Sequence, residues 1–143
     1  MRIIGGSRRG LKLAEVGEGD VAAHLRPTSD RVREAIFNLL VNAHGDPVTG
    51  ARVLDLFAGT GALGLESLSR GAADVTLVDD GAKALALIRA NIAKMRAGAE
   101  THILRCDATR LPPNPAAPCS LIFLDPPYGK ALGEAALASA ARG

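Results

Sequence analysis

Several features that mark particular protein classes are scarce in this sequence. It has two cysteines, one tyrosine and no tryptophan among 143 residues. Cys106 and Cys119 have no Cys-x-x-Cys partner and the three histidines stand singly, which argues against a disulfide framework and against a metal site. No apolar run reaches the roughly 18 residues that cross a bilayer, and Met1 is not followed by a secretory signal. We therefore expect a cytoplasmic protein that binds neither a metal nor a membrane.

The sequence does contain enough apolar material for one folded unit, and its charge is unevenly distributed. Hydrophobic residues make up 48% and charged residues 22% of the chain, as in one globular domain with a core. The net charge is only +2, yet the first twelve residues carry four basic side chains and no acid. A basic arm on a nearly neutral body indicates a polyanionic partner, and a solvated charged face is the alternative.

The N-terminal third divides into a hairpin, a loose connection and a helix. In residues 1–13, two short apolar stretches flank a turn of glycine, serine and arginine, a pattern typical of a β-hairpin. Apolar residues then recur at helical spacing over Asp30–Ala43, with capping residues at 28–30 and a Gly-Asp-Pro stop at 45–47. The apolar positions of this predicted helix are Val32, Ala35, Ile36, Leu39, Leu40 and Ala43.

From Gly50 onward, short apolar runs alternate with helical stretches. Strands are predicted at 53–57, 75–78, 101–104 and 121–124, and helices at 62–70, 81–95 and about 132–141. This alternation predicts right-handed crossovers and a doubly wound, Rossmann-like α/β fold whose mostly parallel sheet is covered on both faces. A proline-rich loop is expected at 111–118. Nothing in the sequence pairs with the outer side of strand 121–124, so we expect a C-terminally truncated fold or a strand from another molecule there.

A glycine-rich segment, 57–64, follows the first predicted strand of the sheet and opens a helix. Its glycines fit G-x-G-x-x-G, a turn that brings backbone close to a ligand and aims helix N–H groups at it. In a dinucleotide-binding protein this turn would hold pyrophosphate, and Asp79, at the end of the next strand, would bind ribose hydroxyls. A tight turn without a ligand is the plainer alternative.

Further acids favour S-adenosylmethionine over a nicotinamide cofactor. Asp55, inside the strand before the glycines, would repel a pyrophosphate but suits the cationic amino group and the sulfonium. Asp107, after the third strand, can accept a hydrogen bond from an adenine amine. Ligands of open α/β sheets bind at the carboxyl edge, so these acids, Asp79 and Asp125 are expected to converge there, unless they cap helices or lie in solvent. The expected cofactor-binding residues are Asp55, Phe57, Ala58, Gly59, Thr60, Gly61, Asp79, Asp107 and Ala108.

The tetrad Asp125-Pro126-Pro127-Tyr128 stands where the fourth predicted strand leaves the sheet. Its prolines fix two φ angles and remove two N–H donors, so its backbone offers mainly acceptors. A nucleobase amine is a poor nucleophile; if the Asp125 carboxylate and the Pro126 carbonyl accept its two hydrogens, they favour the pyramidal nitrogen that attacks a methyl group. Tyr128 would stack on the base. We therefore predict these four residues to be catalytic, the alternative being a proline-stiffened turn.

These motifs together resemble a known family. Asp-Leu-Phe-Ala-Gly-Thr-Gly at 55–61, with the tetrad, is similar to the class I amino-methyltransferases, which share a glycine-rich cofactor loop and an Asp/Asn-Pro-Pro-aromatic site. Residues 2–6, 26–38 and 61–71 narrow the resemblance to the bacterial 16S ribosomal RNA guanine-N2 methyltransferases. Two departures are visible: Asp79 stands where the family usually has Glu, and family members continue through further strands.

The resemblance implies S-adenosylmethionine as cofactor and 16S ribosomal RNA, in a partly assembled small ribosomal subunit, as partner. It implies that the tetrad holds the guanine, and that residues 1–28 form a basic hairpin and connection for RNA contact ahead of a methyltransferase domain at 29–143. The expected RNA-binding residues are Arg2, Arg8, Arg9, Lys12, Arg26, Thr28, Arg31 and Arg33. Three other interpretations stay open: an adenine-N6 DNA methyltransferase, which also uses Asp-Pro-Pro-Tyr, a catalytically inactive RNA-binding fragment of the family, and a nicotinamide oxidoreductase.

Overall fold

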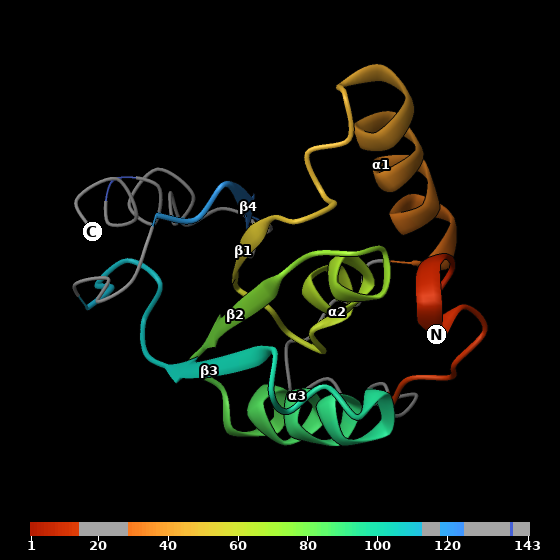
Figure 1. Ribbon diagram of the computed structural model, residues 1–143. Coiled ribbons are helices and arrows are strands. Elements are labelled where there is room, and N and C mark those ends of the chain that lie inside the picture. The colour runs from red at the N-terminus through yellow and green to blue at the C-terminus, as the bar shows by residue number, and fades with distance from the viewer. Residues whose placement is uncertain (15–28, 113–117, 125–137, 139–143) are drawn as a thin grey trace.

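The structure, a computed structural model, describes residues 1–14, 29–112, 118–124 and 138. Figure 1 shows its elements, which are in chain order η1 (Gly6–Arg8), α1 (Asp30–Ala43), β1 (Arg52–Leu56), α2 (Ala62–Ser69), β2 (Asp74–Asp79), α3 (Ala82–Met95), β3 (Thr101–Arg105) and β4 (Leu121–Leu124). The helix predicted at about 132–141 lies outside the described residues apart from Ala138, as does most of the expected proline-rich loop. In the part of the chain that is described, no helix combines the length and apolarity needed to cross a membrane.

The four strands form one parallel sheet in the order β3-β2-β1-β4. The register pairs Leu56 at the end of β1 with Val78 in β2 and with Leu124 in β4, so these strands end together at one carboxyl edge. This arrangement confirms the predicted Rossmann-like α/β class. In the described residues β4 pairs on one side only, with β1.

Helices α2 and α3 lie on the same face of the sheet. Leu65 of α2 and Ile88 of α3 belong to the same core cluster as Val75 of β2. The chain steps from β1 to β2 to β3 in one direction, and successive right-handed crossovers in one direction place their helices on one face. A smaller cluster built on Leu56 and Val78 occupies the other face. The described helices therefore cover one face, whereas the sequence pattern predicted helices on both.

The N-terminal arm, residues 1–14, confirms the predicted hairpin. Arg2 and Lys12 form an antiparallel bridge, and η1 makes the turn between them. The backbone N–H of Ile3 donates to Leu11 (2.9 Å), and that of Leu13 donates to Met1 (2.8 Å). Ile3 and Leu13 are each 1% exposed and join the same core cluster as α2 and α3, so the arm shares the core of the sheet domain. The domain boundary between 28 and 29 stays a prediction.

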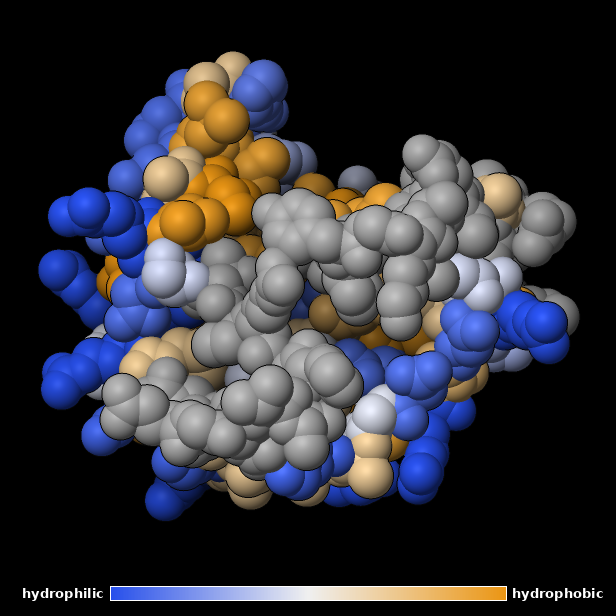
Figure 2. Space-filling model, turned by 180° about the vertical axis from the view of Figure 1, so that it is seen from behind, coloured by the Kyte–Doolittle hydropathy of each residue, from blue (hydrophilic) through white to orange (hydrophobic). Residues whose placement is uncertain are grey.

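Helix α1 begins and ends where the sequence predicted, but only part of the predicted apolar stripe faces the core: Ile36 and Leu40 are partly buried against it. The Ser29 hydroxyl caps it by accepting the N–H of Val32 (3.2 Å). Its buried residues are Arg33 and Phe37, while Val32 and Leu39, both in the predicted apolar stripe, are 49% and 57% exposed. Figure 2 shows the hydrophobic surface that results over this helix.

Phe37 is the contact that fixes α1 to the rest of the domain. Its ring lies 5.6 Å from that of Phe123 in β4, measured between centroids, and the Arg70 guanidinium lies 4.9 Å from the Phe37 centroid. An aromatic pair and a cation over a ring each add stability beyond the area that they bury. The helix therefore packs by this aromatic anchor and the buried side chain of Arg33, with Ile36 and Leu40 partly buried beside them. The burial of Arg33 is not revealed by a pattern of apolar residues.

Candidate functional site

The glycine loop, residues 57–61, connects the end of β1 to the start of α2 through an unusual backbone path. Phe57, Gly59 and Gly61 have φ angles of +57°, +61° and +83°. Gly61 is the N-cap residue of α2, and a Cβ there would lie 3.3 Å from a methyl group of Leu65. Glycine is needed at this point because both the positive φ and the close packing disfavour a side chain. The loop thus turns sharply and presents the N-terminal end of α2 to the carboxyl edge of the sheet.

Asp79 ties the glycine loop to the start of α3. Its Oδ2 accepts the N–H of Gly59 (2.9 Å) and its Oδ1 accepts the N–H of Gly81 (2.9 Å). The N–H of Ala58 donates to the Val78 carbonyl (3.0 Å), which fixes the same loop to β2. A carboxylate oxygen has more than one lone pair, so Asp79 can accept ribose hydroxyls as well. The structure brings Asp79 and the predicted loop residues together, and their binding of cofactor stays a prediction.

Asp55 lies beneath α2 rather than in an open crevice. Its side chain is buried, with 2% of the residue exposed, and its Oδ2 accepts the N–H of Gly64 (3.0 Å). A negative charge at the first turn of a helix is stabilised by the helix dipole. A Cβ on Gly64 would lie 2.8 Å from Val75, so this glycine of the motif permits close packing of helix on sheet. The structure therefore shows Asp55 anchoring α2, where the sequence predicted a partner for the cationic groups of the cofactor.

Asp107 and Ala108 follow β3 at the same edge of the sheet. The Thr109 hydroxyl and N–H both donate to Asp107 Oδ1 (2.7 and 2.8 Å), and they hold the pKa of this exposed carboxyl below its ordinary value. Asp107 is therefore ionised at neutral pH and offers an acceptor to solvent or to a ligand. Ala108 is 4% exposed and packs with Leu56 and Val78, so its side chain supports this edge from within.

The predicted catalytic tetrad, 125–128, lies outside the described residues. The structure does describe the strand that leads to it: β4 ends at Leu124, directly opposite Leu56, the last residue of β1 before the glycine loop. Since the two strands are parallel, the chain leaves both of them at the same edge.

One predicted RNA contact is wrong. Arg33 is 0% exposed, and its guanidinium is paired with Glu66 (Nε to Oε1, 3.2 Å) and with Asp30 (2.9 Å) and donates to the Arg2 carbonyl. Its charge is therefore used inside the protein and is not offered to a phosphate. The sequence places Arg33 among other basic residues and so predicts an exposed side chain, but its guanidinium is held by Asp30 in its own helix and by Glu66 and the Arg2 carbonyl from other elements.

The remaining predicted RNA-binding residues differ in how accessible they are. Arg26 and Thr28 lie outside the described residues. Arg8 is partly buried, and its Nε donates to the Met95 carbonyl (2.8 Å) at the C-terminal end of α3. The exposed side chains are Arg2, Arg9, Lys12 and Arg31. RNA binding by these residues stays a prediction.

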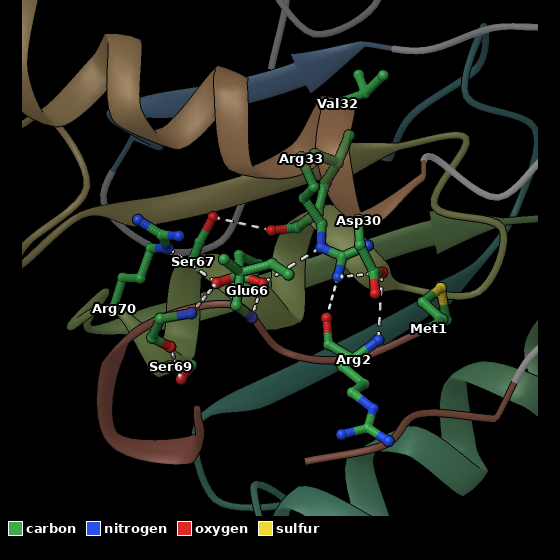
Figure 3. Close-up of polar contacts among 12 residues, drawn as sticks. Met1, Arg2, Asp30, Val32, Arg33, Glu66, Ser67, Ser69 and Arg70 are labelled. Atoms are coloured by element: carbon green, nitrogen blue, oxygen red, sulfur yellow. Dashed lines mark hydrogen bonds and ion pairs between the residues drawn. The ribbon is translucent and has the colours of Figure 1, made fainter. Parts of the chain in front are cut away.

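Glu66 is a central residue that the sequence reasoning missed (Figure 3). Its carboxylate accepts hydrogen bonds from the backbone N–H groups of Ile4 (2.9 Å) and Gly5 (3.0 Å), from Arg33 and from Arg70 Nε (2.8 Å). Glu66 is 0% exposed, and the bonds join the N-terminal arm, α1 and α2. The available signal was an acid inside a helix whose other residues are all small or apolar.

The sheet order, the glycine loop and the acid that closes it at the end of β2 are those of a Rossmann-like fold, which the class I methyltransferases share. The chain belongs to the family described as Conserved hypothetical protein 95, whose model matches residues 1–142. It is 42% identical over 135 residues to Ribosomal RNA small subunit methyltransferase D of Escherichia coli K12, covering 94% of this chain and 63% of that protein. It is 39% identical over 132 residues to Putative rRNA methyltransferase YlbH of Bacillus subtilis, covering 90% of this chain and 67% of that one.

A solved structure agrees with this assignment. Putative methyltransferase yhhF from Escherichia coli superposes with a TM-score of 0.75 at 34% identity, over 97% of this chain and 70% of that one. These similarities confirm the predicted membership in a family of bacterial small-subunit ribosomal RNA methyltransferases. The chain spans 63% of the length of the Escherichia coli K12 relative.

Proposed function

We propose that this chain is an S-adenosylmethionine-dependent enzyme that methylates the N2 amine of a guanine in 16S ribosomal RNA. The observation that supports it most is the shared edge of β1 and β4. One strand leads into the glycine loop and the other leads into the tetrad 125–128. A loop that can hold a methyl donor and a loop that can hold an amine thus leave the sheet side by side.

The residues at this edge suit S-adenosylmethionine in their chemistry. Ribose hydroxyls and an adenine amine are hydrogen-bond donors, and the acids available to them are Asp79 and Asp107, both acceptors when ionised. The glycine loop lets backbone approach the cofactor closely. When bound, the cofactor supplies a methyl group on a positively charged sulfur, and negative side chains at the edge favour that charge.

The tetrad would then prepare the amine. The Asp125 carboxylate and the Pro126 carbonyl accept the two amine hydrogens, and Tyr128 stacks on the base and aligns the nitrogen with the methyl group. The N–C bond forms as the S–C bond breaks, the electron pair leaves with sulfur, and the surplus proton passes to Asp125 or to water. No covalent bond between protein and substrate is needed.

The choice of ribosomal RNA is supported by the names of the relatives, which are ribosomal RNA methyltransferases. The exposed basic residues of the arm supply charge for phosphates. Gly5 and Arg8 lie against Ser69, at the end of α2 away from the glycine loop. An RNA that contacts the tip of the arm and also reaches the glycine loop must therefore span at least the ~12 Å length of α2. This requirement fits a structured RNA better than a free nucleotide.

The test is methyl transfer from labelled S-adenosylmethionine to unmodified small ribosomal subunits, with duplex DNA in parallel and digestion of products to nucleosides. We expect label in N2-methylguanosine, and a loss of about 10²-fold or more in rate for Asp125→Ala. Asp74→Ala is the control, because Asp74 lies at the opposite edge of the sheet and pairs only loosely with Arg52 (3.5 Å).

Each other outcome has a definite meaning. Equal labelling by Asp125→Ala and the unaltered protein would contradict the role of the tetrad. Label in N6-methyladenine would favour the DNA enzyme. Binding of the cofactor and of RNA without transfer would favour an inactive RNA-binding fragment of the family.

A further inference from the structure

Asn91 is a buried polar residue that none of the recognised motifs accounts for. It lies on α3 with no exposed surface. Its Oδ1 accepts the N–H of Ala14 (2.6 Å), while its Nδ2 donates to the Ala14 carbonyl (3.0 Å) and to the Thr60 carbonyl (2.8 Å). Both amide hydrogens and the amide oxygen are therefore used, which is the full pairing that a buried side-chain amide needs.

The two partners of Asn91 belong to different functional parts. Thr60 lies in the glycine loop, and Ala14 is the last described residue before the segment 15–28, which carries the candidate RNA-binding residues Arg26 and Thr28. A second contact joins the same parts, since the Thr60 hydroxyl lies 3.7 Å from the Met1 sulfur. The arm and the loop therefore meet at one residue of α3.

The geometry allows little independent movement. The side-chain amide is planar, and its oxygen and nitrogen bind the Ala14 peptide as a neighbouring strand would. A movement of Ala14 that rotates this plane also turns Nδ2 away from the Thr60 carbonyl. Loss of the hydrogen bond from Asn91 Nδ2 would leave the buried Thr60 carbonyl of the glycine loop without this donor, which costs free energy.

We propose that Asn91 is a positioning residue that couples the cofactor loop to the RNA-contacting arm, so that binding of either ligand favours the conformation that binds the other. This inference rests on the proposed function. Such coupling is reciprocal for binding, and a coupling between two sites commonly amounts to about 5- to 150-fold in affinity.

Two substitutions separate the hydrogen bonds from the packing. Asn91→Asp keeps the size and the acceptor for Ala14 but places a second oxygen against the carbonyls of Ala14 and Thr60. Asn91→Leu removes the polar group without adding charge. Thr101→Val is the matched control, because it deletes a partly buried hydrogen bond to Ala97 (2.8 Å) at the amino end of β3, away from the glycine loop.

The first measurement is equilibrium binding of labelled S-adenosylhomocysteine with and without saturating unmodified small subunits. In the unaltered chain and in Thr101→Val we expect the subunits to tighten binding at least about 5-fold. In Asn91→Asp and Asn91→Leu this ratio is expected to fall to about one. A ratio that is unchanged in both Asn91 variants overturns the inference and leaves the proposed function standing.

The second measurement needs no ligand. Hydrogen exchange in the free protein is expected to rise together at Leu13 in the arm and at Gly61 in the loop in both Asn91 variants, while Val75 in β2 keeps its protection. Faster exchange at only one of the two places would overturn the link. If the unaltered chain binds no S-adenosylhomocysteine, the proposed function fails, and this exchange pattern still decides whether Asn91 joins the two parts.

Discussion

Glu66→Gln is expected to lower the free energy of unfolding by about 3 kcal/mol, because it removes the fully buried one of the two carboxylates that pair with the buried guanidinium of Arg33. Arg33 is 0% exposed and would retain Asp30 as its anionic partner in the described residues. The new amide would also direct an NH₂ group at one of the two backbone N–H donors, Ile4 or Gly5, that now share the carboxylate. With a native stability of roughly 5–15 kcal/mol for a domain of this kind, such a loss is a large fraction of the total.

Urea unfolding followed by circular dichroism measures this loss. Glu34→Gln, on the exposed side of α1, is the control and is expected to change the stability by less than about 0.5 kcal/mol. The double variant Glu66→Gln with Arg33→Met is expected to be less destabilised than the sum of the single changes, because it removes both charges of the pair. Additive losses, or a Glu66→Gln variant as stable as Glu34→Gln, would contradict the role of the buried pair.

The helices and strands of this fold are well predicted from the sequence where a single hydrophobic periodicity, that of a helix or that of a strand, dominates a segment. The bounds Asp30–Ala43 and Leu121–Leu124 agree with the structure. The ends of the remaining described strands and helices differ from the predicted ends by no more than one residue. Hydrophobic periodicity is a local property, so a helix or a strand can be located without knowing its neighbours. The side on which each helix packs depends on strand order, which is a property of the whole sheet.

The sequence predicts the backbone of the candidate site well, but it predicts the surroundings of the charged side chains less well. The glycine loop and Asp79 come together as expected. Asp55 and Arg33 were both expected to face ligands, yet each is buried against a partner in another element, Gly64 and Glu66 respectively. A sequence pattern treats a charge as exposed unless its partner is near in sequence, and these partners are brought near only by the tertiary fold.

Asn91 shows that some of the missed information was present in the pattern. It follows Ile88 by three residues and precedes Met95 by four, so it lies on the buried stripe of α3. A polar residue in such a stripe indicates a buried hydrogen-bonding requirement nearby. The identity of that requirement, the carbonyls of Ala14 and Thr60, could not be inferred because the first of them is 77 residues away in the chain.

Gly6→Ala is expected to release the N-terminal arm from the domain. Gly6 has a φ angle of +80°, and a Cβ there would lie 1.8 Å from the backbone carbonyl oxygen of Ser69, so the arm or the end of α2 must move. Overpacking against backbone commonly costs about 1–3 kcal/mol and the left-handed conformation about 1–2 kcal/mol more. Undocking would also expose Ile3 and Leu13, whose burial contributes roughly 1.5–3 kcal/mol each.

Gly10→Ala is the matched control, because Gly10 has a similar φ of +87° but no atom within 4 Å of the Cβ position. It should lose only the conformational part, about 1–2 kcal/mol, and keep the arm docked. Hydrogen exchange at Ile3 and Leu13 separates the two cases: we expect it to rise in Gly6→Ala while Val75 stays protected, and to stay slow at all three in Gly10→Ala. Equal exchange in the two variants would mean that strain at positive φ, and not contact with Ser69, determines the effect. Because the arm also meets the glycine loop through Asn91, a released arm in Gly6→Ala should loosen Gly61 as well.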